Sequence, residues 1–467
     1  MLDESALQQL REGLRGELLQ PGDGGYEPAR RVWNAMVEKR PALIARCRGV
    51  ADVKATVDFA RENDLLLAVR GGGHNVAGKA VCDGGVVVDL SAMRGVRVDP
   101  AAKAARAQGG ALWGDLDRET QVVGLATTGG LVSTTGIGGL TLGGGIGWLA
   151  RKLGTSSDNL VSADVVTAAG ELVTASEQEN ADLFWGVRGG GGNFGVVTSL
   201  EYRVHPVGPA VLGGAVFYPG ERAADVLRFF REYVQDAPDE LTVLCAFLTA
   251  GPAPFLPEEA HGRLAVALGV CYVGDLDEGE RVLAPLRSFG EPLADVVGPI
   301  PYTALQTMFD QSYPEGRRNY WKSHFFHDIG DEAIEVVVES AARMSPPFSS
   351  FYFEHTGGAI NRIGEDATAF GHRDTSFDFA ILAQWTDPAE DDEQIGWARD
   401  LWAALEPFSM GTVYVNNLGE EGEERIRAAY KPEKFERLVA LKDKYDPENL
   451  FRLNQNIRPS RQPVAAE

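Results

Sequence analysis

The sequence from Ala68 to Gly78 reads Ala-Val-Arg-Gly-Gly-Gly-His-Asn-Val-Ala-Gly. The apolar run at residues 65–69 predicts a strand, which breaks into three consecutive glycines before His74. Residues without a Cβ atom let backbone amides crowd around a ligand, and such amides favour an anion such as a phosphate. The loop is not a P-loop, because no Gly-Lys-Ser/Thr sequence follows it. The stretch therefore predicts a phosphate cradle of another kind.

A second glycine-rich stretch, Thr127 to Gly147, reads Thr-Thr-Gly-Gly-Leu-Val-Ser-Thr-Thr-Gly-Ile-Gly-Gly-Leu-Thr-Leu-Gly-Gly-Gly-Ile-Gly. Its glycines are interleaved with Leu, Ile and Val, which indicates that it folds tightly against a partner. A flat ligand that needs close backbone approach is one interpretation. A glycine-rich turn between core strands is the other.

A third run places Gly190, Gly192 and Gly195 in a GxGxxG pattern. A nicotinamide-binding Rossmann fingerprint needs a helix directly after these glycines. Residues 196–202, Val-Val-Thr-Ser-Leu-Glu-Tyr, instead predict a strand. We therefore reject a Rossmann domain.

Length and composition place the chain among multi-domain globular proteins. With 467 residues, we expect two or three domains. Lys plus Arg number 44 against 67 Asp plus Glu, and the net charge of −23 argues against nucleic acid or an anionic membrane as partner. The N-terminal residues lack a basic patch and a long apolar run, and nowhere do 18 uncharged apolar residues follow one another, so we expect a cytoplasmic protein that acts without a membrane, as a monomer or a homodimer.

Cysteine and histidine usage indicates a reducing compartment and no metal. His324, His327 and Asp328 form only an HxxH pattern without an intervening Glu, which is a weak metal signal, so no metal site is expected. The cysteines have no CxxC spacing and are interpreted as reduced thiols. They are Cys47, Cys82, Cys245 and Cys271.

Periodicity predicts an α+β fold. The composition changes near Pro206, where the glycine clusters stop. Asp52 is a plausible N-cap for a helix that follows a strand at 42–45. Further helices are expected at 6–19, 113–121, 221–235, 331–343, 393–405 and 434–444. Further strands are expected at 86–90, 104–108, 163–168, 241–247, 264–273, 350–354, 377–383 and 413–416, with an extended closing segment at 450–457.

Taken together, the motifs resemble the berberine bridge enzyme-like branch of the FAD-linked oxidases, in the vanillyl-alcohol oxidase superfamily. The motifs occur in the right order over nearly the whole chain. Single-histidine bacterial members, such as 6-hydroxynicotine oxidases and polyketide-tailoring oxidases, look nearest. The motifs are Arg70-Gly-Gly-Gly-His74-Asn75, the 127–147 glycine run, Asn159 with Asp164-Val165-Val166, Gly190 to Val197, and the terminal Phe451-Arg-Leu-Asn-Gln-Asn456.

The resemblance implies a PCMH-type FAD-binding domain of two α/β subdomains at residues 1–205. A substrate domain with an antiparallel sheet flanked by helices follows at 206–417, and residues 418–467 return to the FAD-binding domain. FAD would be joined covalently to His74, which raises the flavin's reduction potential. The cofactor residues that it implies are Arg70, Gly71, Gly72, Gly73, His74, Asn75, Gly78, Thr128, Gly129, Val132, Thr134, Gly138, Gly139, Gly143, Gly147, Asp158, Asn159, Gly195, Val197, Asn454 and Asn456.

Two departures from the family pattern affect the chemistry. Many relatives carry a second covalent link from a cysteine, but that position here is Val132, so the flavin would be attached once. Relatives that oxidise sugars carry a base tyrosine in Tyr-x-Asn-Tyr, whereas this chain reads Tyr414-Val-Asn-Asn417. Asn417 cannot deprotonate a hydroxyl, so another residue must act as base.

Two carboxyl groups are candidates for that base. Asp378 follows the His372-Arg373 pair, as a base glutamate does in plant relatives if one residue is deleted, and Glu354 lies on a strand expected to face the cavity. Burial beside a flavin would raise either pKa toward neutrality. A solvated strand carboxylate is the plain alternative for each, and Tyr414 is a further candidate.

These features favour a monocovalent FAD oxidase that takes a hydride from a small or medium organic substrate, of the natural-product kind, and passes electrons to dioxygen. Thr135 occupies the position that in the family gates dioxygen at the flavin, and it is shorter than Leu or Ile. The alternatives are an oligosaccharide or alcohol oxidase, a dehydrogenase of the same family, and a flavin-binding protein without turnover.

Overall fold

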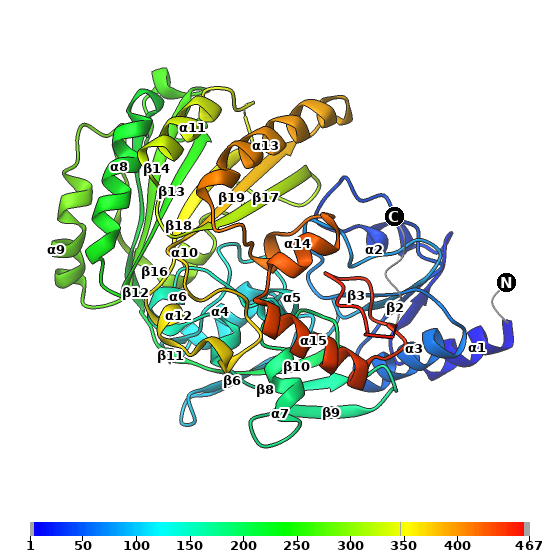
Figure 1. The fold of residues 1–467 in the computed structure, drawn as a ribbon. Helices are drawn as coiled ribbons and strands as arrows, with labels where there is room; N and C mark the ends of the chain where they lie inside the picture. The colour runs from blue at the N-terminus through cyan, green and yellow to red at the C-terminus, as the bar shows by residue number, and fades with distance from the viewer. Residues whose placement is uncertain (1–3, 346, 462–467) are drawn as a thin grey trace.

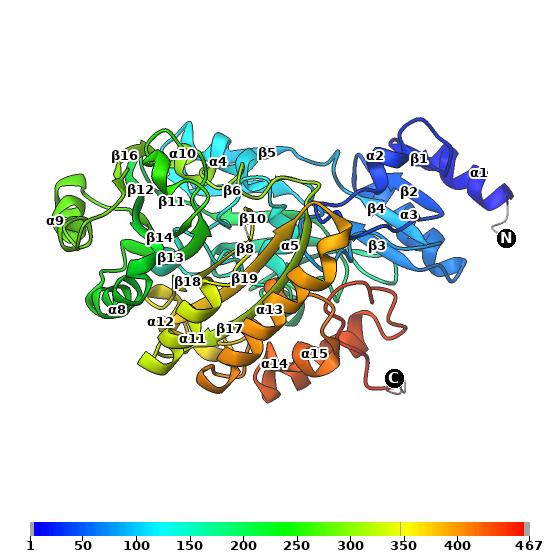
Figure 2. The same cartoon turned by 90° about the horizontal axis from the view of Figure 1, so that it is seen from above.

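A computed structural model describes residues 4–345 and 347–461 of the chain. Within them, the N-terminal sheets lie across from a third sheet that is backed by helices (Figure 1, Figure 2). Residues of these three main β-sheets line one large cavity. No helix among the described residues is long and apolar enough to cross a bilayer.

The first sheet has four strands in the order β1-β2-β4-β3, and its last three strands are parallel. The expected helix at 6–19 ends at Gly13, because residues 17–19 pair antiparallel with β2. Asp52 does not cap the next helix; its carboxylate accepts the amides of Arg15, Gly16 and Arg48. The elements are α1 (Glu4–Gly13), β1 (Glu17–Leu19), α2 (Tyr26–Arg30), β2 (Leu43–Arg46), α3 (Val50–Glu62), β3 (Leu67–Arg70) and β4 (Val86–Asp89).

The second sheet has five antiparallel strands in the order β5-β6-β10-β8-β9. β10 directly follows the third glycine run, which confirms that this run does not open a helix. A separate short antiparallel pair joins β7 to β11, the strand that follows β10. The elements are β5 (Val96–Asp99), β6 (Ala104–Gln108), α4 (Trp113–Gln121), β7 (Leu125–Ala126), α5 (Ile137–Leu142), α6 (Ala150–Leu153), β8 (Leu160–Val166), β9 (Leu172–Ser176), α7 (Ala181–Gly186), β10 (Val196–Arg203) and β11 (His205–Pro206).

The third sheet is an eight-stranded antiparallel sheet in the order β15-β12-β14-β13-β18-β19-β17, with β16 also paired to β12. The sequence pattern missed β12 and β17, and the expected strand at 413–416 was wrong, because residues 415–417 form a 3₁₀ turn. The strands are β12 (Ala210–Pro219), β13 (Leu241–Thr249), β14 (Leu264–Tyr272), β15 (Ala294–Asp295), β16 (Gly298–Pro301), β17 (Arg318–Phe326), β18 (Ser350–His355) and β19 (Phe377–Trp385).

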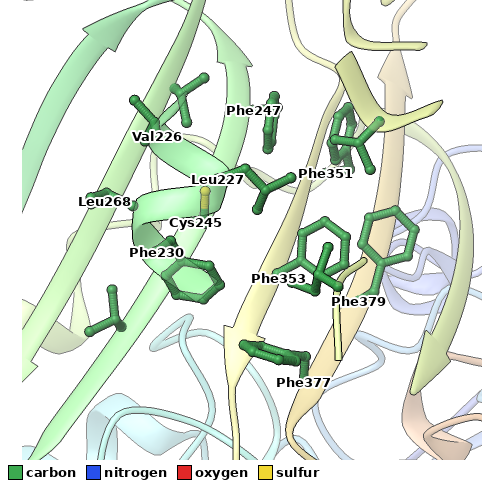
Figure 3. Close-up of a cluster of buried hydrophobic side chains, with 14 of the residues drawn as sticks. Val226, Leu227, Phe230, Cys245, Phe247, Leu268, Phe351, Phe353, Phe377 and Phe379 are labelled. Carbon is green, nitrogen blue, oxygen red and sulfur yellow. The ribbon is translucent and has the colours of Figure 1, made fainter. Parts of the chain in front are cut away.

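Helices cover one face of this sheet (Figure 1). Phe353 and Phe379 from the strands belong to the same buried cluster as Val226, Leu227 and Phe230 of one helix, and Figure 3 shows part of this cluster. The opposite face is left to line the cavity. The covering helices are α8 (Ala223–Tyr233), α9 (Leu276–Arg287), α11 (Asp331–Ala341) and α13 (Asp391–Leu405).

The end of the chain returns to the N-terminal sheets. Leu450 and Phe451 are buried in the core of the four-stranded sheet, and the Asn454 side chain donates to the Gly192 carbonyl at 3.1 Å. The C-terminal segment thereby reaches the third glycine run. The remaining helices are α10 (Tyr302–Gln306), α12 (Ala359–Arg362), α14 (Gly422–Ala428) and α15 (Pro432–Tyr445).

Candidate active site

A cavity of about 1190 Å³ lies between the glycine-rich loops and the helix-free face of the eight-stranded sheet. Sites for single drug-sized molecules are usually about 300 to 1,000 Å³. The larger volume here leaves room for a dinucleotide and a small substrate together. Its walls come from segments far apart in the sequence, including residues 71–75, 130–142, 191–197 and 414–417.

The first glycine loop provides unpaired backbone donors. The amides of Gly71, Gly72, Gly73 and His74 line the cavity and donate no hydrogen bond within the described parts of the chain. The loop also packs directly on the second glycine run. A Cβ atom at Gly72 would lie 2.5 Å from the amide nitrogen of Gly136. A side chain at either position would push the two loops apart. Glycine at both positions therefore keeps the loops in contact and leaves backbone amides free, as binding of a pyrophosphate requires.

His74 is held by an aromatic neighbour that no sequence motif identifies. Its ring stacks on Trp33 with the centroids 4.5 Å apart and an interplanar angle of 19°. The Nε2 atom lies 3.5 Å from the hydroxyl oxygen of Thr134. Burial lowers the pKa of His74 to about 4. The imidazole is therefore neutral at neutral pH and has a lone pair available for bond formation.

The C-terminal asparagines present buried amide oxygens. The Oδ1 atoms of Asn454 and Asn456 are buried and have no hydrogen-bond partner within residues 4–345 and 347–461. Buried acceptors are normally satisfied, so a missing donor group is expected here. Ribityl hydroxyls or a pyrimidine N–H of a flavin would supply such donors. Asn454 lines the cavity, so its Oδ1 atom together with the free glycine amides fits an FAD molecule, whereas Asn456 lies outside the cavity lining.

The predicted cofactor residues divide into two groups. Gly71, Gly72, Gly73, His74, Asn75, Val132, Gly138, Gly139, Gly195, Val197 and Asn454 line the cavity. Other predicted residues lie outside that lining, namely Arg70, Gly78, Thr128, Gly129, Thr134, Gly143, Gly147, Asp158, Asn159 and Asn456.

Several members of the second group hold the walls of the cavity. Arg70 forms an ion pair with Asp89, and Asp158 forms a buried ion pair with Arg373 at 2.6 Å. Gly143 has no room for a Cβ atom because the Asn416 side chain is packed against it. These roles position the loops around the cavity.

Glu354 and Asp378 are direct cross-strand neighbours of β18 and β19. Both side chains face the cavity and are only 2% exposed. Burial, and then the neighbouring Asp378, raises the pKa of Glu354. Burial raises the pKa of Asp378 to about 7. Two adjacent buried carboxyl groups cannot easily ionise together, so the pair retains a proton at neutral pH.

Asn417 and Tyr414 complete this end of the cavity. The Asn417 side-chain amide donates to Asp378 Oδ2 at 3.3 Å, while Asp378 Oδ1 has no partner in the described chain. The Tyr414 hydroxyl accepts hydrogen bonds from the Gly145 amide and the Asn416 side chain, each at 2.7 Å. Burial raises the pKa of Tyr414, so the phenol stays neutral. Among these residues, Asp378 is the best placed to carry a negative charge.

Apolar side chains form most of the remaining wall. Along β13, Leu244, Ala246 and Leu248 line the cavity, while the alternating Cys245 and Phe247 lie in the helix-covered core. The pattern could not be read from the sequence, because both faces of this strand are apolar. Other cavity residues that the sequence did not predict are Phe217, Met308, Phe309, Trp321 and Tyr352.

The histidines near the other predicted motifs are engaged elsewhere. His324 stacks on Trp402 with ring centroids 4.9 Å apart. His372 Nε2 lies 3.0 Å from the Ala428 carbonyl oxygen, outside the cavity lining. The His372-Arg373 pair therefore anchors the segment that leads into β19, and only Asp378 of that motif reaches the cavity.

Comparison with known proteins agrees with this geometry. Residues 41–176 match a family model described as an FAD binding domain, and residues 413–458 match the model "Berberine and berberine like". The chain is 33% identical to (R)-6-hydroxynicotine oxidase of Paenarthrobacter nicotinovorans over 462 residues, which covers 96% of this chain and 97% of the relative. An FAD-linked oxidoreductase of Dictyostelium discoideum is 33% identical over 454 residues, 96% of each chain.

Solved structures show the same fold. The crystal structure of 6-hydroxy-D-nicotine oxidase from Arthrobacter nicotinovorans has a TM-score of 0.86 at 33% identity and covers 96% of this chain and 98% of that chain. A chitooligosaccharide oxidase has a TM-score of 0.83 at 25% identity, covering 98% and 99%. The fold, the cavity and these similarities define an FAD-dependent oxidoreductase. More specifically, the chain belongs to the berberine bridge enzyme-like family of FAD-linked oxidoreductases, which confirms the resemblance seen in its motifs.

Proposed function

We propose that the protein is a monocovalent FAD oxidase that oxidises a small or medium, largely apolar organic substrate and reduces dioxygen to hydrogen peroxide. The carrying observation is that Glu354 and Asp378 face the same cavity as His74 and the free glycine amides. Bound FAD supplies the hydride acceptor. In each turnover, the substrate loses a hydride and a proton, and two electrons and two protons convert dioxygen to hydrogen peroxide.

The attachment to His74 rests on the neutral imidazole and its surroundings. A neutral nitrogen would be able to bond to the flavin 8-methyl carbon as that carbon gives up a hydrogen, with the two electrons passing to the flavin and then to dioxygen, whereas an imidazolium has no free lone pair for this bond. The stack on Trp33 fixes the ring plane, and Val132 offers no thiol for a second link. The amides of Gly71, Gly72 and Gly73 would hold the pyrophosphate.

The carboxyl pair is the proposed general base. Asp378 accepts the Asn417 amide, which favours placing the negative charge on Asp378. Glu354 then retains the shared proton. A substrate hydroxyl or amine N–H that reaches Asp378 can transfer its proton to the free Oδ1 atom as the hydride departs. A natural product with apolar rings would fit walls formed by Phe217, Leu248 and Phe309 better than a sugar would.

Thr135 is the proposed point of dioxygen access, because this short side chain lines the cavity. In the experiment, the holoenzyme is reduced anaerobically and mixed with aerated buffer, and flavin reoxidation and peroxide are measured. Thr135→Leu is expected to slow reoxidation strongly. Thr249→Leu, which enlarges a cavity residue on β13, is the matched control and should reoxidise normally.

A wild-type flavin that stays reduced in air but passes electrons to a dye would identify a dehydrogenase and contradict the oxidase proposal. Equal reoxidation rates for wild type and Thr135→Leu would exclude Thr135 as the access point while leaving the oxidase intact.

A further inference from the structure

Three consecutive residues of the second glycine run each have a different partner. Ser133 donates its amide to Asp310 Oδ1 at 2.9 Å and its hydroxyl to Asp310 Oδ2 at 2.6 Å. Thr134 lies 3.5 Å from His74 Nε2. Thr135 lines the cavity. A shift of this loop would therefore move the surroundings of His74 and the cavity wall together.

The partner of Ser133 comes from the segment between β16 and β17, which is far away in the sequence. Gln306, four residues before Asp310, donates to the Gly130 carbonyl at 3.3 Å and to Asp117 at 2.9 Å. Both ends of the stretch 130–133 are thus held by side chains of one segment. The two hydrogen bonds to the Asp310 carboxylate are the stronger attachment, because charge-assisted pairs exceed neutral ones.

The same segment also touches the cavity. Met308 and Phe309, which lie between the two anchoring residues, line its wall. Phe309 stacks on Trp148 with centroids 5.8 Å apart. Residues 306–310 therefore connect the wall of the proposed substrate space to the loop that carries Thr135.

We propose that Asp310 is a positioning residue that fixes Thr134 against His74 and Thr135 at the cavity wall, and so controls both covalent attachment of FAD and access of dioxygen to it. The proposal rests on the proposed oxidase function. Asp310 itself touches no reacting atom in this account. Its carboxylate acts only through Ser133, which is 9% exposed and has no other side-chain partner in the described structure.

The loop should stay folded without Asp310, because two backbone hydrogen bonds remain. Gly114 donates to the Ser133 carbonyl at 2.8 Å, and Trp113 donates to the Thr135 carbonyl at 3.0 Å. Asp310→Ala is therefore expected to displace the loop while the fold persists. Asp310→Asn retains one acceptor oxygen and should give an intermediate effect. Glu315→Ala, an exposed acid of the same connection, is the matched control.

The experiment uses the purified holoenzymes. The fraction of chains that carry covalent FAD is measured by intact mass, and the dithionite-reduced enzymes are mixed with dioxygen or with ferricyanide. We expect Asp310→Ala to lower the covalent fraction and to change the dioxygen rate by about tenfold or more, since small displacements near reacting groups have effects of this size. The ferricyanide rate and the melting temperature should stay close to those of Glu315→Ala.

Adding Ser133→Ala to Asp310→Ala should cause no further change, because the two residues share one interaction. The proposal is overturned if Asp310→Ala matches wild type in both covalent fraction and dioxygen rate, or if the ferricyanide rate falls equally. If wild type reacts with ferricyanide and not with dioxygen, the oxidase proposal fails and the covalent fraction alone decides the role of Asp310. A wild type with neither covalent FAD nor dioxygen reactivity contradicts both.

Discussion

The two sides of the cavity are built in different ways. The side formed by the N-terminal sheets presents mainly backbone: Gly71, Gly72 and Gly73 offer free amides, and the second glycine run adds further glycines interleaved with side chains such as Val132 and Thr135. The opposite side, on the eight-stranded sheet, presents side chains that alternate along its strands, with Glu354 and Asp378 at one end. Backbone atoms suit a cofactor shared by many proteins, whereas side chains can change with the substrate.

This difference predicts how each side responds to substitution. Changes to the carboxyl pair should slow the reduction of the flavin by the substrate and leave the cofactor bound. Changes to the glycines should remove cofactor binding or stability, whatever the substrate is.

The largest effect is expected at the carboxyl pair. Replacing Asp378 by Asn should slow flavin reduction by a substrate about 100-fold to 10,000-fold, because the positioned base is lost. Glu354→Gln should slow it less, because Asp378 remains as the base. Anaerobic stopped-flow absorbance measures this step directly. Wild-type reduction should become faster as the pH rises through about 7, where the Asp378 carboxyl ionises.

Glu335→Gln is the control for this comparison, because Glu335 is an exposed acid on α11, on the helix-covered side of the sheet. It should reduce at the wild-type rate. If both carboxyl variants also reduce at that rate, the base lies elsewhere, with Tyr414 as the next residue to examine. Loss of FAD from these variants would show that the carboxyl side of the cavity also contributes to cofactor binding.

On the backbone side, Gly72→Ala should damage the contact between the two glycine loops. The new Cβ atom would lie 2.5 Å from the Gly136 nitrogen, and overpacking of this kind typically costs about 1 to 3 kcal/mol. We expect lower FAD content and a lower free energy of unfolding. Gly49→Ala is the matched control, since nothing lies within 4 Å of a Cβ atom there. Equal FAD content in both variants would refute the tight loop contact.

The smallest expected effect is on stability. The Asp378 pKa is raised to about 7 from a usual value of 3.8, so the folded protein holds a proton that the unfolded chain releases. The contribution of the protonated Asp378 to the free energy of unfolding is fully present below about pH 4 and is lost as the pH rises through 7. Asp378→Asn should therefore raise the melting temperature relative to wild type more at pH 8 than at pH 5, as differential scanning calorimetry can measure. An equal difference in melting temperature at both pH values would indicate that folding does not raise the pKa of Asp378.

Sequence patterns could predict the backbone side because its residues are consecutive. Three glycines before His74 indicate close approach of a ligand without any knowledge of the tertiary structure. The other side draws single residues from several strands, and the strand at 241–249 is apolar on both faces, so no periodicity identifies Leu244 or Ala246 as cavity residues. Only the resemblance to a known family pointed to Asp378.

Long-range partners explain the remaining differences. Trp33 reaches His74 from the segment before β2, and Asp310 reaches Ser133 across 177 positions of the sequence. Neither pair belongs to a local motif. The strand expected at 413–416 became a turn because Tyr414 and Asn416 bond to the second glycine run and are not paired in a sheet.

The intact mass of the denatured protein is the decisive measurement, because covalent attachment at His74 would assign the backbone side of the cavity to FAD. The wild-type mass should exceed that of the bare chain by one FAD, the yellow colour should stay with the acid precipitate, and His74→Ala should lose both. A wild-type mass equal to that of the bare chain would contradict it.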